Sequence, residues 1–258
     1  MTIGGESIQS TNPRALSFLL GVGLLVCSLI PSALAEEGSS SDPRPSVRSR
    51  RNFLNIGSTH RDHAELNTAL EEAGYEPFAE KGTRLGWVTY SYGQSKWIVG
   101  SSGEFMFLRT DGPEQLEAMT ISIPLNVQLG YRLIEHPTLM LFPFVGIGFI
   151  YQSLDVAYDV PVDFEGQLSY PVGESHFTSF TPIISAGIQV DNLFTMRSVD
   201  GRDHGLTLGI RLEYLHGLAS DRWSSTMRTV NQAPEVTTDS WSVAILFGWG
   251  SQGATSED

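Results

Sequence analysis

The sequence predicts an all-β fold, in which eight antiparallel strands form an up-and-down barrel with one short helix in a loop. Three observations support this fold: apolar residues recur at every second position, the alternating segments are long, and the links between them alternate in length. The segment MTISIPLNVQLGYRL, residues 119–133, shows the period most clearly. Every odd-numbered position in it is apolar, whereas no even-numbered position holds a large hydrophobic side chain.

The N-terminal residues are typical of an export signal. An apolar stretch at 15–35 follows Arg14 and ends in the tripeptide ALA, a small-residue pattern that suits signal peptidase. We predict a signal peptide over residues 1–35, cleaved after Ala35; a retained transmembrane anchor and a lipid-anchored Cys27 are the alternatives. Cleavage would remove the only cysteine of the chain, which would exclude disulfides, thiolate catalysis and cysteine-ligated metals.

Residues 36–51 are rich in Ser, Pro and Arg and lack an apolar period, so we predict a flexible leader. Its arginines either contact anionic lipid or stay solvated; they are Arg44, Arg48, Arg50 and Arg51. The formal net charge of the chain is −13, which argues against nucleic acid as a partner.

One helix is predicted, at about residues 62–74, inside the first long link. Asp62 is expected at its N-cap with Glu65 three residues later, which is the spacing of a capping box. Two leucines four residues apart share one face of this helix, and Gly74 provides a C-terminal stop.

Eight strands are predicted within a barrel domain at 52–250, which a C-terminal tail follows at 251–258. They cover residues 53–58, 85–92, 97–108, 119–133, 139–151, 180–192, 206–217 and 241–249. The links after the second, fourth and sixth strands are the shorter ones, the sixth being 194–205. The other links are longer on the whole and include 110–118, 155–176 and 218–239. Long loops at one end and short turns at the other are typical of barrels that span a membrane.

The apolar face of the sheet is predicted to point outward, into lipid. Most alternating segments reach the length of about 9–11 residues that a tilted strand needs to cross a bilayer, whereas soluble strands average about 5–6. The other face carries small polar residues with few charges, which suits the narrow interior of an eight-stranded barrel. Glu104, Arg211 and Glu213 share that face, and an unpaired buried charge is costly. We therefore expect Arg211 to pair with at least one of the two glutamates.

Aromatic residues near the strand ends are candidates for two interfacial girdles, although aromatics also favour strands in general. They are Trp97, Tyr131, Tyr151, Tyr214, Trp241 and Trp249. With its cleavable leader, alternating strands, loop lengths and aromatic last strand WSVAILFGWG, the chain resembles the small eight-stranded outer-membrane β-barrel proteins of Gram-negative bacteria over about residues 52–250. That last strand looks like the assembly signal of such barrels, although further residues follow it here.

Prolines interrupt three of the predicted strands, where each lacks the N–H that a strand donates to its neighbour. Pro143 and Pro182 lie near strand starts and are expected to mark bulges. Pro124 lies inside its strand and has no explanation at this level.

Two groups of residues are candidate chemical sites, and neither fits well. Lipid A deacylases among the resembled proteins carry a His-x-Ser-Asn pattern, whereas here His216 and Ser220 are four residues apart and no Asn follows. On a continuous strand that spacing is roughly 13 Å, too far for a general base to reach its nucleophile. His60 and His63 flank Asp62 but lack a third metal ligand.

The sequence therefore predicts an exported, integral outer-membrane barrel of the cell envelope with a structural or surface-binding role and a lumen filled by side chains. No catalytic, cofactor-binding or metal-binding residues are expected. The expected partners are outer-membrane lipids, lipopolysaccharide and the outer-membrane assembly machinery, with no nucleic acid, and the expected state is a monomer. The alternatives are a hydrolase acting on lipid A or another lipid, a small porin-like pore, and a secreted soluble barrel that binds an apolar ligand.

Overall fold

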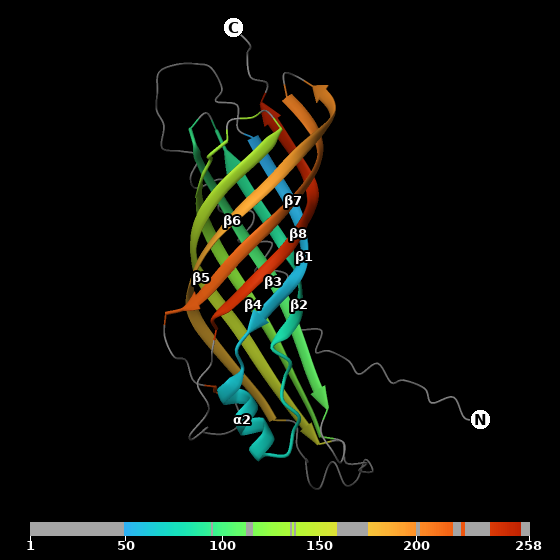
Figure 1. Cartoon of the computed structure of the whole chain (residues 1–258), viewed down its shortest axis with the longest axis vertical. Helices are drawn as coiled ribbons and strands as arrows, with labels where there is room; N and C mark the ends of the chain where they lie inside the picture. Colours follow the sequence, from blue (N-terminus) through green and yellow to red (C-terminus); the bar gives the residue numbers. More distant parts are fainter. Residues whose placement is uncertain are drawn as a thin grey trace, which may run out of the picture. The chain divides into compact units, whose positions relative to one another are not determined.

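The computed structural model describes residues 49–93, 95–111, 116–134, 136, 138–158, 175–199, 202–218, 223–224 and 238–253. The predicted signal peptide and most of the predicted leader lie outside these residues. The described residues form eight strands, each paired antiparallel with the next in sequence, and β1 pairs with β8 to close the barrel. Figure 1 shows the strands winding obliquely around the barrel, with the helix at one end.

The strands and the helix have the following bounds: β1 Ser49–Arg61, α2 Ala64–Glu72, β2 Lys81–Tyr92, β3 Trp97–Asp111, β4 Leu116–Tyr131, β5 Leu139–Tyr158, β6 Ser175–Val199, β7 Arg202–Gly217 and β8 Ser240–Gly253. All eight predicted strands are therefore present, and the predicted all-β barrel with one short helix is confirmed.

Most strands run further than the apolar period indicated, which corrects several predicted boundaries. β1 begins at Ser49, so the leader predicted for 36–51 ends earlier, and β8 continues to Gly253 instead of giving way to a tail at 251. The link predicted at 110–118 shrinks to 112–115, and the link predicted at 194–205 shrinks to 200–201. The physical reason is that the strand ends at the rims lack the pattern of apolar residues outward and polar residues inward, as the inward Leu108 and Leu154 show, so hydrophobic alternation stops before backbone pairing does.

Two ends of the barrel can now be defined. The short-turn end holds the links 93–96, 132–138 and 200–201, and the long-loop end holds the links 62–80, 112–115, 159–174 and 218–239. The predicted alternation of link lengths is retained except after β3, where four residues suffice because β3 and β4 both extend toward the turn.

Helix α2 lies in the first link, as predicted, and its N-cap is His63 instead of Asp62. Asp62 still helps the helix to start, because its Oδ1 accepts a hydrogen bond from the Ala64 N–H at 2.8 Å. Gly74 has φ 91°, a left-handed conformation that glycine adopts at little cost, and it ends the helix as expected. No helix in the described part of the chain is long and apolar enough to cross a membrane.

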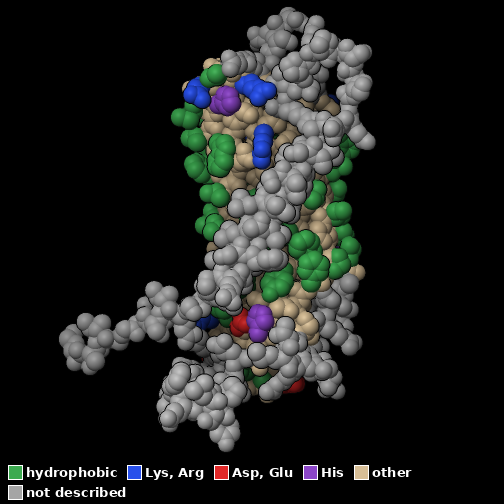
Figure 2. Space-filling model, turned by 180° about the vertical axis from the view of Figure 1, so that it is seen from behind, with side chains coloured by type: hydrophobic (Ala, Val, Ile, Leu, Met, Phe, Trp, Pro, Cys, Tyr) green, Lys and Arg blue, Asp and Glu red, His purple; other side chains and the backbone are tan. Residues whose placement is uncertain are grey.

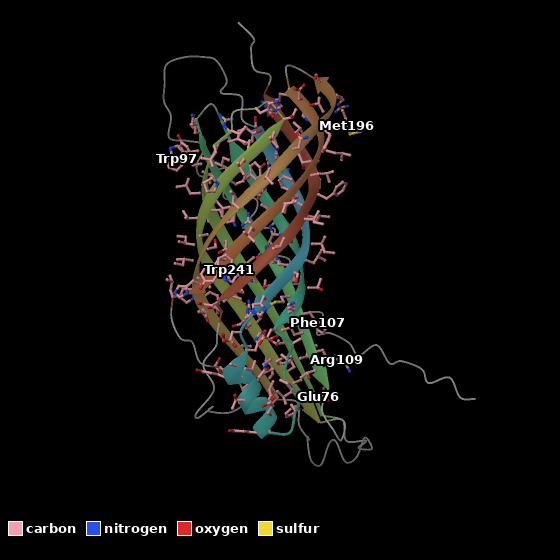
Figure 3. All side chains as sticks on the ribbon, viewed as in Figure 1. Glu76, Trp97, Phe107, Arg109, Met196 and Trp241 are labelled. Atoms are coloured by element: carbon pink, nitrogen blue, oxygen red, sulfur yellow. The ribbon has the colours of Figure 1, made fainter. Side chains whose placement is uncertain are left out.

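The apolar side chains of the strands point out of the barrel and the polar ones point into it. Leu85, Ile56, Ile245, Ile210 and Val190 form one outward row across five adjacent strands, and Ile245 is 62% exposed. Figure 3 shows outward side chains along the flank of the barrel, most of them without polar atoms. A soluble barrel that holds an apolar ligand would have the opposite arrangement, so that alternative is wrong.

Pro124 is accommodated by a gap in the strand pairing. β3 and β4 pair in the same register on both sides of it, from Gly103 opposite Leu125 to Met106 opposite Ser122, while the two positions between drop out. Because proline has no N–H to donate, an interrupted ladder beside Pro124 is the expected consequence. The sequence contains no sign of this gap.

Candidate functional site: a lumen closed at three levels

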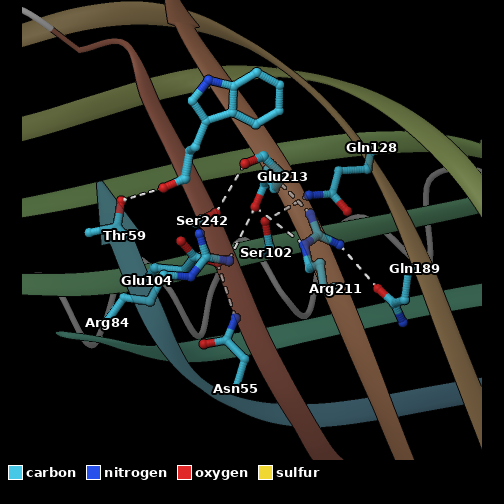
Figure 4. Close-up of polar contacts among 11 residues, drawn as sticks. Asn55, Thr59, Arg84, Ser102, Glu104, Gln128, Gln189, Arg211, Glu213 and Ser242 are labelled. Atoms are coloured by element: carbon cyan, nitrogen blue, oxygen red, sulfur yellow. Dashed lines mark hydrogen bonds and ion pairs between the residues drawn. The ribbon is translucent and has the colours of Figure 1, made fainter. Parts of the chain in front are cut away.

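The middle of the lumen is crossed by a chain of ion pairs. Arg84 on β2 lies 2.6 Å from Oε1 of Glu104 and 3.3 Å from Oε2 of Glu213. Arg211 donates to both oxygens of Glu213, from Nη2 at 2.9 Å and from Nε at 3.2 Å (Figure 4). The predicted pairing of Arg211 with a glutamate is thus confirmed. Arg84 was missed, because it lies one residue before the predicted strand.

Polar and aromatic side chains complete this layer. Asn55 donates to Oε1 of Glu104 at 3.1 Å, and Gln189 accepts a hydrogen bond from Nη1 of Arg211, also at 3.1 Å. The Arg211 guanidinium lies over the Phe144 ring, 3.9 Å from its centroid. All the charged groups of the layer are buried, so the contacts compensate for the water that these groups lose.

A second layer closes the lumen at the short-turn end. Arg51 forms a buried ion pair with Asp191, whose other oxygen accepts hydrogen bonds from Tyr90 Oη at 2.6 Å and Gln189 Nε2 at 3.0 Å. Arg51 was predicted to belong to the leader and to face solvent or lipid, which is wrong, because it points inward from β1. An apolar cluster packs in the same region: Phe53, Val88, Tyr90, Tyr92, Ile98, Met140, Phe142, Phe144 and Leu246.

Helix α2 closes the long-loop end. Its buried Leu66 and Leu70 join three inward-facing strand residues and three loop residues in a single cluster. The strand residues are Leu108, Ala118 and Leu154, and the loop residues are Tyr75, Phe78 and Trp223. The Asn67 side chain ties the helix down, since it donates to the Phe78 carbonyl at 3.0 Å and accepts from the Phe78 N–H at 2.9 Å. Side chains of the described residues therefore pack inside the barrel at its middle and toward both ends.

His63, at the start of α2, is buried against Phe78 at a ring distance of 6.2 Å. Burial and the nearby Arg61 guanidinium lower the pKa of His63 to about 4, although Asp62 acts in the opposite direction. His60 instead points outward and lies 3.8 Å from Glu80. The structure thus separates the two histidines weighed as metal ligands, and the described residues contain no group of three potential ligands.

His216 lies on the outer rim at the long-loop end and pairs with Asp239 at 3.0 Å. Asp239 also accepts hydrogen bonds from Tyr214 Oη at 2.9 Å and from the Gly217 N–H at 3.2 Å. Partial burial raises the pKa of Asp239, but the bonds from His216, Gly217 and Tyr214 outweigh it and hold this pKa below its usual range. Ser220, weighed as a nucleophile, lies outside the described residues.

The exposed apolar side chains around the barrel form an apolar belt, and aromatic pairs lie at both of its borders. At the short-turn end Trp97 and Tyr131 pack edge to face at 5.3 Å, and at the long-loop end Tyr214 and Trp241 pack at 4.6 Å. Both tryptophans are more than half exposed, which suits the interface between lipid and water. A closed ring with an apolar exterior, aromatic borders and a charged, filled interior defines a membrane β-barrel of the outer-membrane type.

The chain is structurally similar to small outer-membrane barrels of known structure. Ail of Yersinia pestis is 9% identical with a TM-score of 0.42, and the match covers 80% of this chain and 99% of Ail. OprG of Pseudomonas aeruginosa is 13% identical with a TM-score of 0.40, and the match covers 81% of this chain and 97% of OprG. A major outer membrane protein of Thermus thermophilus is 10% identical with a TM-score of 0.37, and the match covers 77% of this chain and 98% of that protein. No protein-family model and no curated protein sequence matches the chain. The class given above therefore stands on the strand pairing and the exposed belt of this chain.

Proposed function

We propose that this chain is an integral outer-membrane protein with a structural or surface-binding role, and that its barrel conducts no solute. The observation that carries the proposal is that the Arg84 layer, the Arg51 layer and the cluster under α2 all pack side chains across the inside of the barrel. A pore needs a continuous water-filled path, whereas an eight-stranded barrel has room only for its own side chains.

The proposal includes export after cleavage at Ala35, assembly by the outer-membrane machinery, and a monomer surrounded by outer-membrane lipid and lipopolysaccharide. The support for it is the predicted signal pattern at 1–35 and the exposed apolar belt. The capped long-loop end would then present a rigid platform, since α2 is packed into the barrel mouth.

The test combines two measurements on the full chain. Heat-modifiable gel migration of the outer-membrane fraction should show a band that shifts on boiling, and planar bilayers that contain the purified protein should show no single-channel steps above the lipid background. A porin measured in parallel gives the positive control. Absence of the protein from the outer-membrane fraction would refute the membrane role, and reproducible conductance steps would refute the closed lumen.

A lipid hydrolase is the second candidate, favoured by the hydrogen bond that orients His216 through Asp239. A histidine held in this way can act as a general base when a nucleophile lies within reach. A mass shift of lipid A on expression of the chain, lost in His216→Ala, would establish this candidate. Unchanged lipid A in cells that contain the folded barrel would leave the structural or surface-binding role standing.

A further inference from the structure

Basic residues form a row on the outward face of the barrel at the short-turn end. Arg197 on β6 lies opposite His204 on β7, His204 lies opposite Ser251 on β8, and Ser251 lies opposite Arg50 on β1. Arg202 stands two residues from His204 on the same outward face. Figure 2 shows Lys, Arg and His side chains gathered at this end of the barrel, above a column of hydrophobic side chains.

The row brings positive groups together without compensation from the described residues. The three arginines are exposed, and among the described residues none forms an ion pair with a carboxylate. Asp203, which separates Arg202 from His204 in sequence, belongs to the opposite face of the strand and bonds to Ser198. A group of exposed arginines without described carboxylate partners creates a positive potential at this rim, so the arrangement favours an anion as a partner.

The position of the basic row relative to the apolar belt indicates what kind of anion it would bind. The next outward row toward the middle of the barrel contains Phe194, Leu206 and Trp249, which lie opposite one another in that order. Met196, at the irregularity in the pairing of β6 with β7, is 73% exposed beside the row (Figure 3). The basic groups therefore lie just beyond the belt, at the depth of lipid headgroups.

We propose that Arg50, Arg197, Arg202 and His204 bind the phosphate groups of anionic phospholipids in the leaflet at the short-turn end. This inference rests on the proposed membrane location. The planar guanidinium groups donate paired hydrogen bonds to phosphate oxygens, the hydroxyl of Ser251 provides a further donor, and Trp249 and Leu206 pack against the acyl chains.

The opposite end of the barrel also carries outward basic residues, since His60 on β1 lies opposite Lys81 on β2 and Arg109 is exposed on β3. There the outward histidines each face a carboxylate, in the pairs His60–Glu80, His176–Asp155 and His216–Asp239. The two ends therefore differ in that described carboxylates accompany the outward histidines at the long-loop end, and the proposed site lies at the short-turn end.

Native mass spectrometry of the folded full-length protein in detergent tests the proposal, with phosphatidylglycerol and phosphatidylcholine of the same acyl chains added in equal amounts. The wild type should bind phosphatidylglycerol preferentially, and R197Q/R202Q should lose about fivefold in this preference for each arginine removed. R197K/R202K should keep part of the preference, because lysine keeps the positive charge but lacks the planar guanidinium that donates paired hydrogen bonds. K81Q, which removes an exposed charge at the long-loop end, should match the wild type.

Three results would overturn the proposal: equal binding of the two lipids by the wild type, an unchanged preference in R197Q/R202Q, or an equal loss in K81Q. Displacement of the lipid by glycerol 3-phosphate at the same concentration would also overturn it, since the site would then take a soluble phosphate ester. Heat-modifiable migration of each variant confirms that it is folded. A wild type that folds into membranes yet shows no preference refutes the lipid site alone, whereas a wild type absent from the membrane refutes the proposed function.

Discussion

Arg84 is the residue on which the lumen network depends. It is the only described cation in contact with Glu104, and it also reaches Glu213, which Arg211 holds from the other side. We expect Arg84→Met to lower the free energy of unfolding by about 3 kcal/mol or more, because it leaves the Glu104 carboxylate buried with only the Asn55 amide as a partner. Urea unfolding of the barrel in lipid vesicles measures this change.

The double variant Arg84→Met/Glu104→Gln should be compared with the single variant Arg84→Met. Removing both charges should recover most of the loss, since the cost comes from the charge left without a partner. Ser179→Ala serves as the matched control at a buried lumen position, because the Ser179 hydroxyl has no hydrogen-bond partner among the described residues. A single Arg84 variant as stable as this control would mean that the ion pairs do not hold the lumen together.

The sequence revealed part of this network and missed the rest for an identifiable reason. Arg211, Glu213 and Glu104 stand out because each occupies a polar position inside a clearly alternating segment. Arg84 and Arg51 lie on strand ends where the alternation is weak, so the sequence does not show that they point inward. Which charge meets which depends on the shear of the closed barrel, and a single strand does not encode it.

At the scale of elements, we expect the packing of α2 into the barrel mouth to depend on pH. The pKa of His63 falls from its ordinary 6.5 to about 4 on burial. Between these two pH values, His63 stays neutral while the helix is packed and takes up a proton when the segment is released. The packing is therefore strongest above pH 6.5 and weakens as the pH falls toward 4. We expect it to lose about 2 kcal/mol between pH 7 and pH 5.

Hydrogen–deuterium exchange in α2, corrected for the intrinsic pH dependence of exchange, measures this loss. Protection of residues 64–72 should fall at pH 5 in the wild type and should change little in His63→Gln, which cannot gain a proton. His60→Gln, at an exposed histidine three residues earlier, should behave as the wild type does. Equal pH dependence in all three proteins would show that His63 does not control the cap.

The helix itself was predictable, whereas its role was not. Leu66 and Leu70 share one face and Gly74 ends the helix, and these local signals fixed its existence and extent to within two residues at each end. Its docking site consists of inward apolar residues such as Leu108 and Leu154. They belong to strand ends that carry little periodicity, and they come together only when the barrel closes.

For the whole molecule, the apolar belt determines the environment in which the barrel is stable. The outward residues of β8 run from Trp241 to Trp249 with Ile245 midway. Eight residues extend about 27 Å along a strand, which a tilt of about 40° reduces to roughly 20 Å of height, close to the apolar band of known membrane barrels. Ile245 should therefore lie near the bilayer midplane.

Ile245→Arg tests this placement most directly. An arginine at the midplane should lower the free energy of unfolding in vesicles by about 2–4 kcal/mol, and the heat-modifiable folded band should diminish accordingly. Leu133→Arg is the matched control, since Leu133 is similarly exposed (55% against 62%) but lies past Tyr131 at the border of the belt, where the cost should be about 0–1 kcal/mol. If both variants cost the same, depth in the bilayer would not govern stability, because only a lipid environment makes the penalty depend on the distance from the midplane.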